Sequence, residues 1–407
     1  MEKITDQMID SIKQIDCTGC KMCEDVCPVD AISYETDREG FWYPKVDYSK
    51  CIECQKCVKS CPSLSEHRNL EAREAEVYAA WALDDRIRLK STSGGIFYIL
   101  AQQMIDQGGM IAACKYTVDF KSAYHDIGET TGDLEAFKGS KYFQSDTEGI
   151  YKKIKEQLKA GRKVLFCGTP CQVAGLNRYV GTNNPDLITV DFICRGINSP
   201  MVYRKYIEDC ERHHKSVVKK VHLKNKNKGW TRLGTYMEFQ NGRTYYRDRI
   251  NDPWVNGYVR GDLFMRPCCS ECKYKERIRV ADISIGDFWG LQNTHDNLFK
   301  GISVVLTNTD RGARYIKMVE DKLHMESRTY EEASKGNGCL LTSAPMGKYR
   351  EEFFNKLNDT EFEVLIWNLL GETKKNILIK ELKYNVTGFI RKMKHGMMER
   401  FRFFKKQ

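Results

Sequence analysis

Two cysteine runs with the same spacing are the part of this sequence best suited to do chemistry. Each run reads C-x2-C-x2-C-x3-C-P, once from Cys17 to Pro28 and again from Cys51 to Pro62. Three thiolates of a run lie in one tight loop and the fourth is directed away, which favours two [4Fe-4S] clusters whose ligand sets are exchanged. Zinc or disulfides are the alternative, but paired zinc sites favour C-x2-C pairs with a longer gap between them.

The two runs, both prolines included, resemble bacterial-type two-cluster ferredoxins over about the first sixty residues. In that pattern the fourth cysteine of each run binds the cluster of the other run. The resemblance therefore implies one cluster held by Cys17, Cys20, Cys23 and Cys61, and a second held by Cys51, Cys54, Cys57 and Cys27. Such a module moves single electrons and holds no substrate, so the rest of the chain must determine where the electrons go.

Length, cysteine use and charge limit what the rest of the chain can be. At 407 residues the chain is too long for one ordinary core, so two or three domains are expected. Its 17 cysteines without a hydrophobic leader indicate a reducing compartment, and no apolar run approaches a membrane span, so a cytoplasmic protein is expected. The net charge of +10 comes mostly from residues 373–407, where eleven Lys and Arg face two Glu, and so does not predict nucleic-acid binding.

Apolar runs and turn signals predict a mixed α/β (α+β) fold after a polar linker at 63–76. Strands are predicted at 77–83, 163–167, 187–193, 281–285 and 302–306, with a hairpin at 233–247 around Asn241-Gly242. Helices are predicted after Gly95, after Thr147 as N-cap, at Pro170, at Pro200 and after Asp310 as N-cap. The strand, helix and strand between 163 and 193 predict a parallel pair with a right-handed crossover.

Nine cysteines lie outside the two runs, and several follow predicted strands. Cys167, Cys171 and Cys194 are expected beyond the carboxyl ends of neighbouring strands, where open α/β sheets bind ligands. Together with the C-x2-C pair Cys269 and Cys272, loops at one sheet edge can supply the four thiolates of a third cluster. Alternatively, the first two are buried thiols and the C-x2-C pair is a small zinc or redox site.

Two segments have the composition of a phosphate-binding site. Ser93, Gly94 and Gly95 precede an apolar helix, whose free backbone N–H groups and positive dipole end attract anions. Segment 137–145 brings Lys138 and Lys141 together beside a tyrosine and an amide. An ordinary N-cap and a solvated loop are the alternatives. Neither a G-x-G-x-x-G nor a P-loop pattern occurs, so a Rossmann or Walker site is not predicted.

Four short motifs resemble the signature set of one family: FCGTPCQ at 166–172, DFICRG at 191–196, CSECK at 269–273 and GDFWG at 286–290. This family comprises the beta subunits of hydrogenases and dehydrogenases that use the deazaflavin coenzyme F420. The resemblance covers about residues 75 to 325. It implies FAD and a [4Fe-4S] cluster close together, with hydride passing between flavin and substrate. The family also includes chlorophyll-pathway reductases and bacterial members found among cell-surface polysaccharide genes.

The resemblance implies the ligands Cys171, Cys194, Cys269 and Cys272 for the third cluster, with Cys167 and Cys268 as spares. The candidate FAD contacts are Ser93, Gly94, Gly95, Lys138, Ser140, Lys141, Tyr142, Gly168, Thr169, Pro170, Gln172 and Asp287. No catalytic residue is assigned. Arg195 stands where many members have histidine and Lys224 where they have arginine, which puts deazaflavin specificity in question.

The expected function is that of an iron–sulfur flavoprotein oxidoreductase. Single electrons from a donor such as ferredoxin or a reductase would pass through the clusters to FAD, which releases them in pairs as hydride. Deazaflavin, a cell-surface polysaccharide or lipid-linked substrate, or another organic molecule is the expected acceptor. A non-catalytic subunit that relays electrons to a partner enzyme is the first alternative. A flavin-less iron–sulfur assembly protein is the second.

The expected division places a two-cluster ferredoxin domain at 1–66, the flavin-binding N-terminal part of the family at 75–160, its C-terminal part with the third cluster at 161–350, and a basic helical tail at 355–407. Apolar tail residues recur at three- and four-residue spacing among basic ones: Phe389, Ile390, Met393, Met397, Phe401 and Phe404. This pattern is typical of a helix lying on an anionic membrane surface, which would make the protein peripheral on the inner face. Packing on the protein's own core or on a partner helix is the alternative, and Gly388 and Gly396 weaken any helix.

Overall fold

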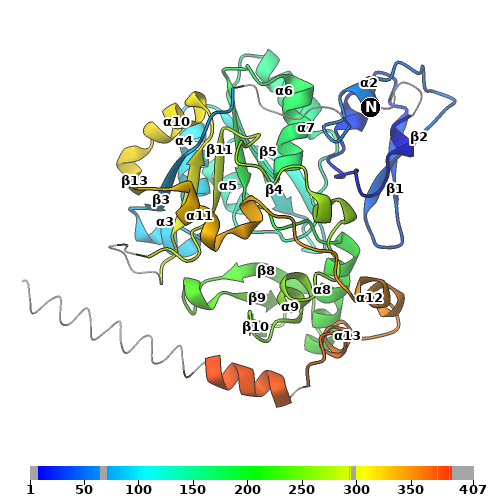
Figure 1. Cartoon of the computed structure of the whole chain (residues 1–407), viewed down its shortest axis with the longest axis vertical. Coiled ribbons are helices and arrows are strands. Elements are labelled where there is room, and N and C mark those ends of the chain that lie inside the picture. The colour runs from blue at the N-terminus through cyan, green and yellow to red at the C-terminus, as the bar shows by residue number, and fades with distance from the viewer. Residues whose placement is uncertain are drawn as a thin grey trace, which may run out of the picture.

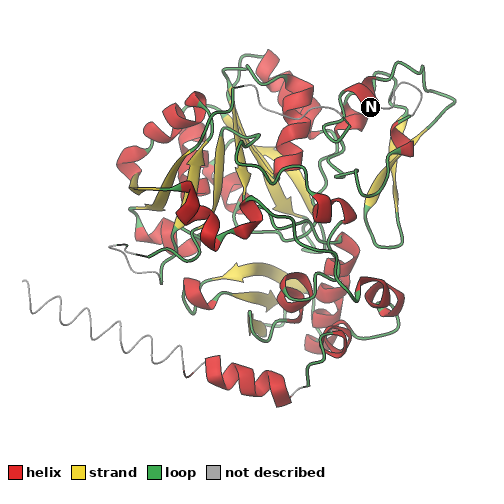
Figure 2. Cartoon of the chain, in the orientation of Figure 1, coloured by secondary structure: helices red, strands yellow, loops and turns green. Residues whose placement is uncertain are grey.

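A computed structural model describes residues 8–64, 71–292, 294, 299–373, 375–384 and 386. Figure 1 shows a small N-terminal domain, residues 8–64, packed beside α6 and α7 of a large domain that begins at residue 71. The large domain consists of a broad sheet between helices and a smaller sheet with its own helices (Figure 2). The predicted mixed α/β architecture is confirmed.

The N-terminal domain is built around the two cysteine runs. One short helix lies within each run, α1 (Met22–Asp25) and α2 (Lys56–Lys59), and the antiparallel pair β1 (Ile32–Thr36) and β2 (Trp42–Val46) joins them, after the single turn η2 (Ile9–Ser11). Its small core combines aliphatic side chains with cysteines of both runs. A domain of this size buries little apolar surface, so the groups bound by its cysteines matter for its stability.

The broad sheet has eight strands in the order β13-β3-β12-β11-β7-β6-β4-β5. Their bounds are β3 Glu76–Ala82, β4 Met110–Tyr116, β5 Ala123–Gly128, β6 Val164–Gly168, β7 Leu187–Phe192, β11 Ile283–Asp287, β12 Ser303–Thr307 and β13 Leu323–Arg328. Strands β4, β6, β7 and β11 are parallel, so the predicted parallel pair is confirmed. Strands from both sides of residue 160 share this sheet, so residues 75–160 and 161–350 both contribute to it, and their division into two parts stays a prediction.

Helices bury both faces of the broad sheet. They are α3 Asp85–Lys90, α4 Ile96–Asp106, α5 Thr131–Phe137, α6 Ile150–Lys159, α7 Pro170–Val180, α10 Asp310–Lys317 and α11 Tyr330–Gly336, with the turns η5 Glu320–Lys322 and η6 Gly338–Leu340. Successive residues of β6 show why both faces are apolar. Leu165 packs with one core cluster, and Val164 and Phe166 pack with the other. Side chains alternate across a strand, so a strand covered on both faces reads as a continuous apolar run.

The smaller sheet has the order β10-β9-β8 and packs with helices that precede and follow it in the chain. Its elements are β8 Val218–Asn225, β9 Gly234–Phe239, β10 Thr244–Asp248, α8 Pro200–His214, α9 Pro253–Val259, α12 Arg350–Lys356 and α13 Phe362–Leu369, with the turns η3 Trp230–Arg232 and η4 Pro267–Glu271. The predicted hairpin is confirmed, with Gly242 at φ +81° in its turn. Ser199 caps α8 through the N–H of Val202, as expected before Pro200.

Two of the predicted helix caps are wrong. Thr309, one residue earlier than Asp310, caps α10. Helix α6 begins after Gly149 rather than after Thr147, whose hydroxyl instead donates to the carbonyl oxygen of Cys20 at 2.8 Å. The second and third amides of α6 are satisfied from the N-terminal domain.

Asp25 makes this cap across the domain interface. Its Oδ2 accepts hydrogen bonds from the N–H of Tyr151 at 2.9 Å and of Lys152 at 3.1 Å. A pairing between residues more than a hundred positions apart leaves no local sequence signal, so reasoning from the sequence selects the nearest threonine instead.

The tail is described only in part. Residues 375–384 are helical, with Leu378 and Leu382 exposed. The apolar residues from Phe389 to Phe404 that predict membrane contact lie outside the described residues, so that contact stays a prediction. Within the described part of the chain, no helix is long and apolar enough to cross a membrane.

Asp25→Ala should loosen the start of α6, because losing an N-cap costs about 0.5–2 kcal/mol. We expect the amides of residues 151–154 to exchange hydrogen about 5–30 times faster, as a loss of one to two kcal/mol implies. Asp30→Ala is the matched control. It removes another interdomain contact, the exposed Asp30–Lys152 ion pair of 3.0 Å, which is worth little. Equal exchange in the two variants would contradict the capping role of Asp25.

Candidate metal centres and cofactor pocket

The cysteines of the N-terminal domain form two groups that mix the two runs. Cys23 lies near Cys20, Cys17 and Cys61, and burial first and then these neighbours raise the pKa of its thiol. The hydroxyl of Tyr34 also lies 2.9 Å from Cys23 Sγ. The fourth cysteine of the second run therefore joins three cysteines of the first, as the exchanged ligand sets require.

The other group surrounds a small cavity lined by Cys27, Cys51, Cys54 and Cys57. Burial raises the pKa of Cys57, and the nearby Cys54 and Cys27 raise it further. The backbone N–H of Ala31 donates to Cys27 Sγ at 3.3 Å. Backbone donors to sulfur are typical of iron–sulfur sites, where they influence the reduction potential.

The two groups differ in their exposure. Cys54 is exposed to solvent, whereas Cys17 and Cys20 are buried. The carbonyl oxygen of Cys20 also accepts a hydrogen bond from the Tyr151 hydroxyl at 2.8 Å, and the neighbouring Lys21 pairs with Asp146 at 2.8 Å. The group with Cys17 thus lies at the domain interface, and we call it the interface group. The group with Cys54 lies towards solvent, and we call it the distal group.

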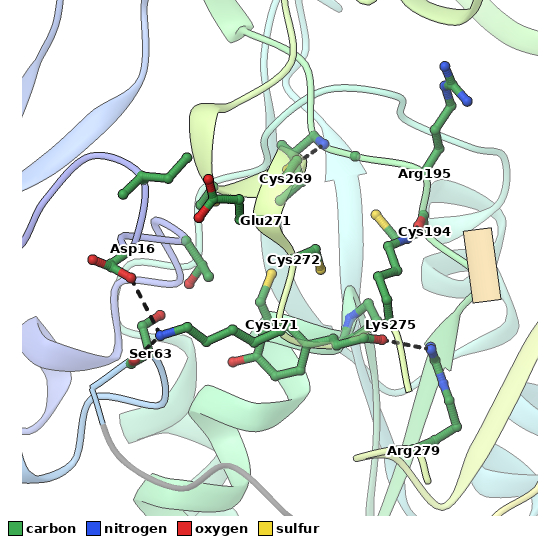
Figure 3. A pocket seen from close by; sticks show the side chains of 18 residues that line it. Asp16, Ser63, Cys171, Cys194, Arg195, Cys269, Glu271, Cys272, Lys275 and Arg279 are labelled. Carbon is green, nitrogen blue, oxygen red and sulfur yellow. Dashed lines mark hydrogen bonds and ion pairs between the residues drawn. The ribbon is translucent and has the colours of Figure 1, made fainter. Parts of the chain in front are cut away.

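A third set of cysteines lines a cavity between the N-terminal domain and the sheet edge. Figure 3 shows Cys171, Cys194, Cys269 and Cys272 around this space. The first lies in the first turn of α7, the second follows β7, and the others belong to or follow η4. Burial raises the pKa of Cys171, with Cys194, Cys272 and Cys20 adding to the effect.

The spare cysteines of this region are also placed. Cys268 lines the same cavity, whereas Cys167 lines a different one. Cys339, which sequence reasoning did not rank, lies near Cys194. Lys275 holds these two segments together by donating to both of their carbonyl oxygens. Among the described residues, no group of three or more His, Cys, Asp or Glu side chains is placed to hold a single metal ion.

The second cavity encloses about 250 Å³ and collects most of the candidate FAD contacts. Those that line it are Ser93, Gly95, Lys138, Ser140, Lys141, Tyr142, Gly168, Thr169, Gln172 and Asp287. Two do not. Pro170 lines the cysteine cavity instead. Gly94 is packed against the sheet, where its N–H donates to Ser303 Oγ at 2.9 Å and an added Cβ would lie 2.5 Å from Ala80 O.

The lysines of this cavity are less free than their sequence suggests. Lys141 donates to the carbonyl oxygens of Cys114, Phe137 and Lys138 at 2.9–3.0 Å, and burial lowers its pKa to about 8. Lys138 pairs with Glu135 at 2.9 Å. The ammonium of Lys141 therefore holds its own loop together and offers a bound anion its charge more than its hydrogen bonds.

The cap of α7 connects the two cavities. Thr169 caps this helix and its N–H bonds Gln172 Oε1 at 2.9 Å, while Gln172 Nε2 donates to Ser145 Oγ at 3.1 Å. Gly168 and Thr169 line the 250 Å³ cavity, and the next two residues, Pro170 and Cys171, line the cysteine cavity. Four successive residues at the start of α7 therefore line both cavities, which lie on either side of this turn.

Comparison with protein families identifies both parts of the chain. Residues 161–333 match the family that describes the C terminus of the coenzyme F420 hydrogenase/dehydrogenase beta subunit. Residues 16–64 and 43–103 match families described as 4Fe-4S dicluster domains, so the expected fusion is confirmed.

Curated relatives match short stretches of the chain. NADH-quinone oxidoreductase subunit I of Pelobacter propionicus is 37% identical over 57 residues, which are 12% of this chain and 31% of that protein. A component of the Na(+)-translocating ferredoxin:NAD(+) oxidoreductase complex of Acetobacterium woodii is 48% identical over 46 residues, 11% of this chain and 13% of that protein. The chain thus spans about a third or less of these relatives.

One solved structure with a similar chain is the F420-reducing [NiFe] hydrogenase complex from Methanosarcina barkeri. The similarity covers 72% of this chain and 93% of that chain, with 18% identity and a TM-score of 0.45.

The two positions where this chain departs from the beta-subunit pattern are both engaged in ion pairs. Lys224 pairs with Asp287, whose second oxygen accepts from Trp230 Nε1 at 2.8 Å. Both oxygens of this candidate FAD contact are therefore occupied by protein groups. Arg195 lines the cysteine cavity and pairs with Asp262 at 2.6 Å. The charge of each of these two cations is therefore already paired with a carboxylate of the protein.

The exchanged ligand sets predict different outcomes for the two fourth cysteines. Cys61→Ser should remove the cluster of the interface group, and Cys27→Ser that of the distal group, each with a loss of about four iron atoms per chain. The remaining paramagnetic signal should therefore differ between the two variants when each is reduced. Identical remaining signals would contradict the exchange.

Proposed function

We propose that this protein is an iron–sulfur flavoprotein oxidoreductase that passes electrons from a ferredoxin-type donor through [4Fe-4S] clusters to FAD and on as hydride to an organic acceptor. The turn between β6 and α7 is the observation that carries the proposal. It contributes Gly168 and Thr169 to the 250 Å³ cavity and Cys171 to the four-cysteine cavity. A cluster and a flavin bound there would be neighbours.

The order of the thiol groups supports a continuous path for electrons through the protein. Cys54 is exposed and offers an entry point. The interface group comes next, and its Cys20 reaches helix α7, where an added Cβ on Gly175 would lie 3.4 Å from Cys20 Sγ. Cys171 in the first turn of the same helix continues the path to the third set of cysteines.

The residues present fit both cofactors in their chemistry. Four buried or half-buried cysteines from three chain segments suit a cluster, since a [4Fe-4S] cluster takes four thiolates. The 250 Å³ cavity offers the hydroxyl and amide groups and the positive charge that a diphosphate and a flavin ring bind. Clusters transfer one electron at a time, and a flavin collects two and releases them as hydride.

The acceptor in this proposal is deazaflavin, a lipid-linked or polysaccharide substrate, or another organic molecule. The alternative function is a relay subunit that hands electrons to a partner enzyme, and the similarity to subunits of multi-subunit redox complexes favours it. Turnover by the isolated chain with a reduced donor and a soluble acceptor separates the two. An enzyme turns over alone, whereas a relay subunit needs its partner.

The third cluster can be counted. Anaerobically reconstituted protein should hold about twelve iron atoms per chain, against about eight for a dicluster domain alone. Cys171→Ala should lose about four and should no longer reduce its bound flavin when mixed with a reduced low-potential donor. Cys210→Ala, which alters a buried thiol in the core of α8, is the matched control and should keep both properties. Saturation of the wild-type chain at eight iron atoms would show that the third cluster is absent.

Flavin binding should depend on pH through Lys141. Its pKa of about 8 leaves it charged at pH 7 and mostly neutral at pH 9, so a bound diphosphate loses a nearby cation as pH rises. We expect the dissociation constant for FAD to rise about tenfold between pH 7 and pH 9. Lys141→Arg stays charged and should flatten this dependence, whereas Lys138→Arg should keep it. Fluorescence titration of FAD measures both, and a flat wild-type profile would count against Lys141.

A further inference from the structure

Arg266 is a fully buried cation, and most of the hydrogen bonds of its guanidinium cross the domain interface to the N-terminal domain. Its Nε donates to the carbonyl oxygen of Cys17 at 2.8 Å, and Nη2 donates to Trp42 O at 2.9 Å. Nη2 also lies 3.4 Å from Cys17 Sγ, within hydrogen-bond distance of sulfur. On the side of the large domain, Nη1 donates to Gln144 Oε1 at 3.0 Å.

The surroundings are shaped around the guanidinium. Its central carbon lies 4.4 Å from the ring centroid of Tyr43 and 5.4 Å from that of Phe41. Gly19, at φ +66°, leaves the space beside it. An added Cβ there would lie 2.8 Å from Arg266 Nη1 and 2.2 Å from Gln144 Nε2. This glycine, in the middle of the first cysteine loop, is therefore required by a residue of the other domain.

Arg266 lacks the counter-charge that buried arginines normally have. Arg279 pairs with Asp191 at 3.1 Å, and Arg350 pairs with Glu39. Within the part of the chain that the structure describes, none of the hydrogen-bond partners of Arg266 is a carboxylate. An unpaired buried charge is strongly destabilising. Cys17 and, on its own segment, Cys268 and Cys269 lie close enough to interact with the charge of Arg266. A cysteine that binds a cluster does so as a thiolate, so it would supply the missing negative charge.

We propose that Arg266 is the counter-ion of the cluster held by the interface group, and that its charge raises the reduction potential of this cluster above that of the distal one. The proposal rests on the electron path described above. A [4Fe-4S] cluster with four thiolates is an anion that gains one more negative charge on reduction, and net charge and hydrogen bonds to sulfur set its potential. A fixed cation at Cys17 therefore favours the reduced state. Electrons that enter near Cys54 would collect at the domain interface, next to Cys171.

Two substitutions separate the charge from the shape of the side chain. Arg266→Met removes the charge at similar length, and Arg266→Lys keeps it. Arg178→Met is the matched control, because this exposed guanidinium on α7 also crosses the interface, to Lys59 O at 2.8 Å, without contacting a cysteine. Potentiometric titration followed by electron paramagnetic resonance measures the potentials in the full-length protein. The interface signal is identified by its loss in Cys61→Ser.

In Arg266→Met we expect at least a tenfold lower ratio of reduced to oxidised interface cluster at a given potential, which is about 59 mV for one electron. Arg266→Lys should recover more than half of this shift, and the distal cluster and Arg178→Met should match the wild type. The proposal is overturned if the interface cluster of Arg266→Met has the same reduction potential as that of the wild type. It is also overturned if Arg266→Lys shifts this potential as far as Arg266→Met does. If Arg266→Met is isolated without its interface cluster, the cluster content of Arg266→Lys decides the outcome. The proposal stands if Arg266→Lys contains the interface cluster, and it is refuted if Arg266→Lys lacks the cluster as well.

These outcomes do not depend on the third cluster or on the flavin. A wild-type protein with eight iron atoms and no flavin would refute the proposed function, and the shift of the interface cluster could still be measured. Conversely, normal flavin reduction with unchanged potentials in Arg266→Met would refute the role of Arg266 alone.

Discussion

The buried loop from Cys17 to Asp25 is the constraint on which the rest of the structure depends. Several polar groups of this loop have partners in the large domain. Carbonyl oxygens accept from Thr147, Tyr151 and Arg266, and the Asp25 carboxylate caps α6. Buried polar groups are costly when unpaired, so this set of bonds defines one docking position for the N-terminal domain. That position brings Cys20 against α7 and thereby aligns the three groups of thiols.

The parallel strands provide the second part of the arrangement. Because β6 and β7 run in the same direction, the loops after both strands emerge at one edge of the sheet. Cys171 and Cys194 follow these strands, and η4 returns Cys269 and Cys272 to the same edge from a distant part of the chain. The cysteine cavity and the 250 Å³ cavity therefore share a wall. Direct passage of electrons between two cofactors requires this kind of closeness.

The lysines in and beside the 250 Å³ cavity are held by oxygen atoms of the protein. Lys141 holds its own loop through three carbonyl oxygens, and Lys226 likewise donates to the carbonyl oxygens of Arg88, Ser93 and Lys300, with a pKa that burial lowers to about 7. Lys224 is neutralised by Asp287. Positive charge is thus held in place by the fold, and a bound anion does not need to order flexible side chains. Preorganised charge of this kind is worth more than charge on mobile side chains.

The sequence by itself determined the features that depend on neighbouring residues. The spacing of the two cysteine runs identified the dicluster domain, and the periodicity around 163–193 predicted the parallel pair. Pro170 also marked the start of α7. These features depend on backbone geometry and on hydrogen bonds between nearby residues, so they can be predicted without knowledge of the fold.

Only the tertiary structure decided which distant residues meet. It assigned the cap of α6 to Asp25 rather than Thr147, showed that the carbonyl oxygens of its own loop occupy Lys141, and placed Arg266 against Cys17, 249 residues away. Arg266, Lys275 and Cys339 carry no local pattern, because an isolated Arg, Lys or Cys looks the same on a surface as in a core. Their roles arise from burial and from unlike charges brought together by chain packing, which spacing along the sequence does not encode.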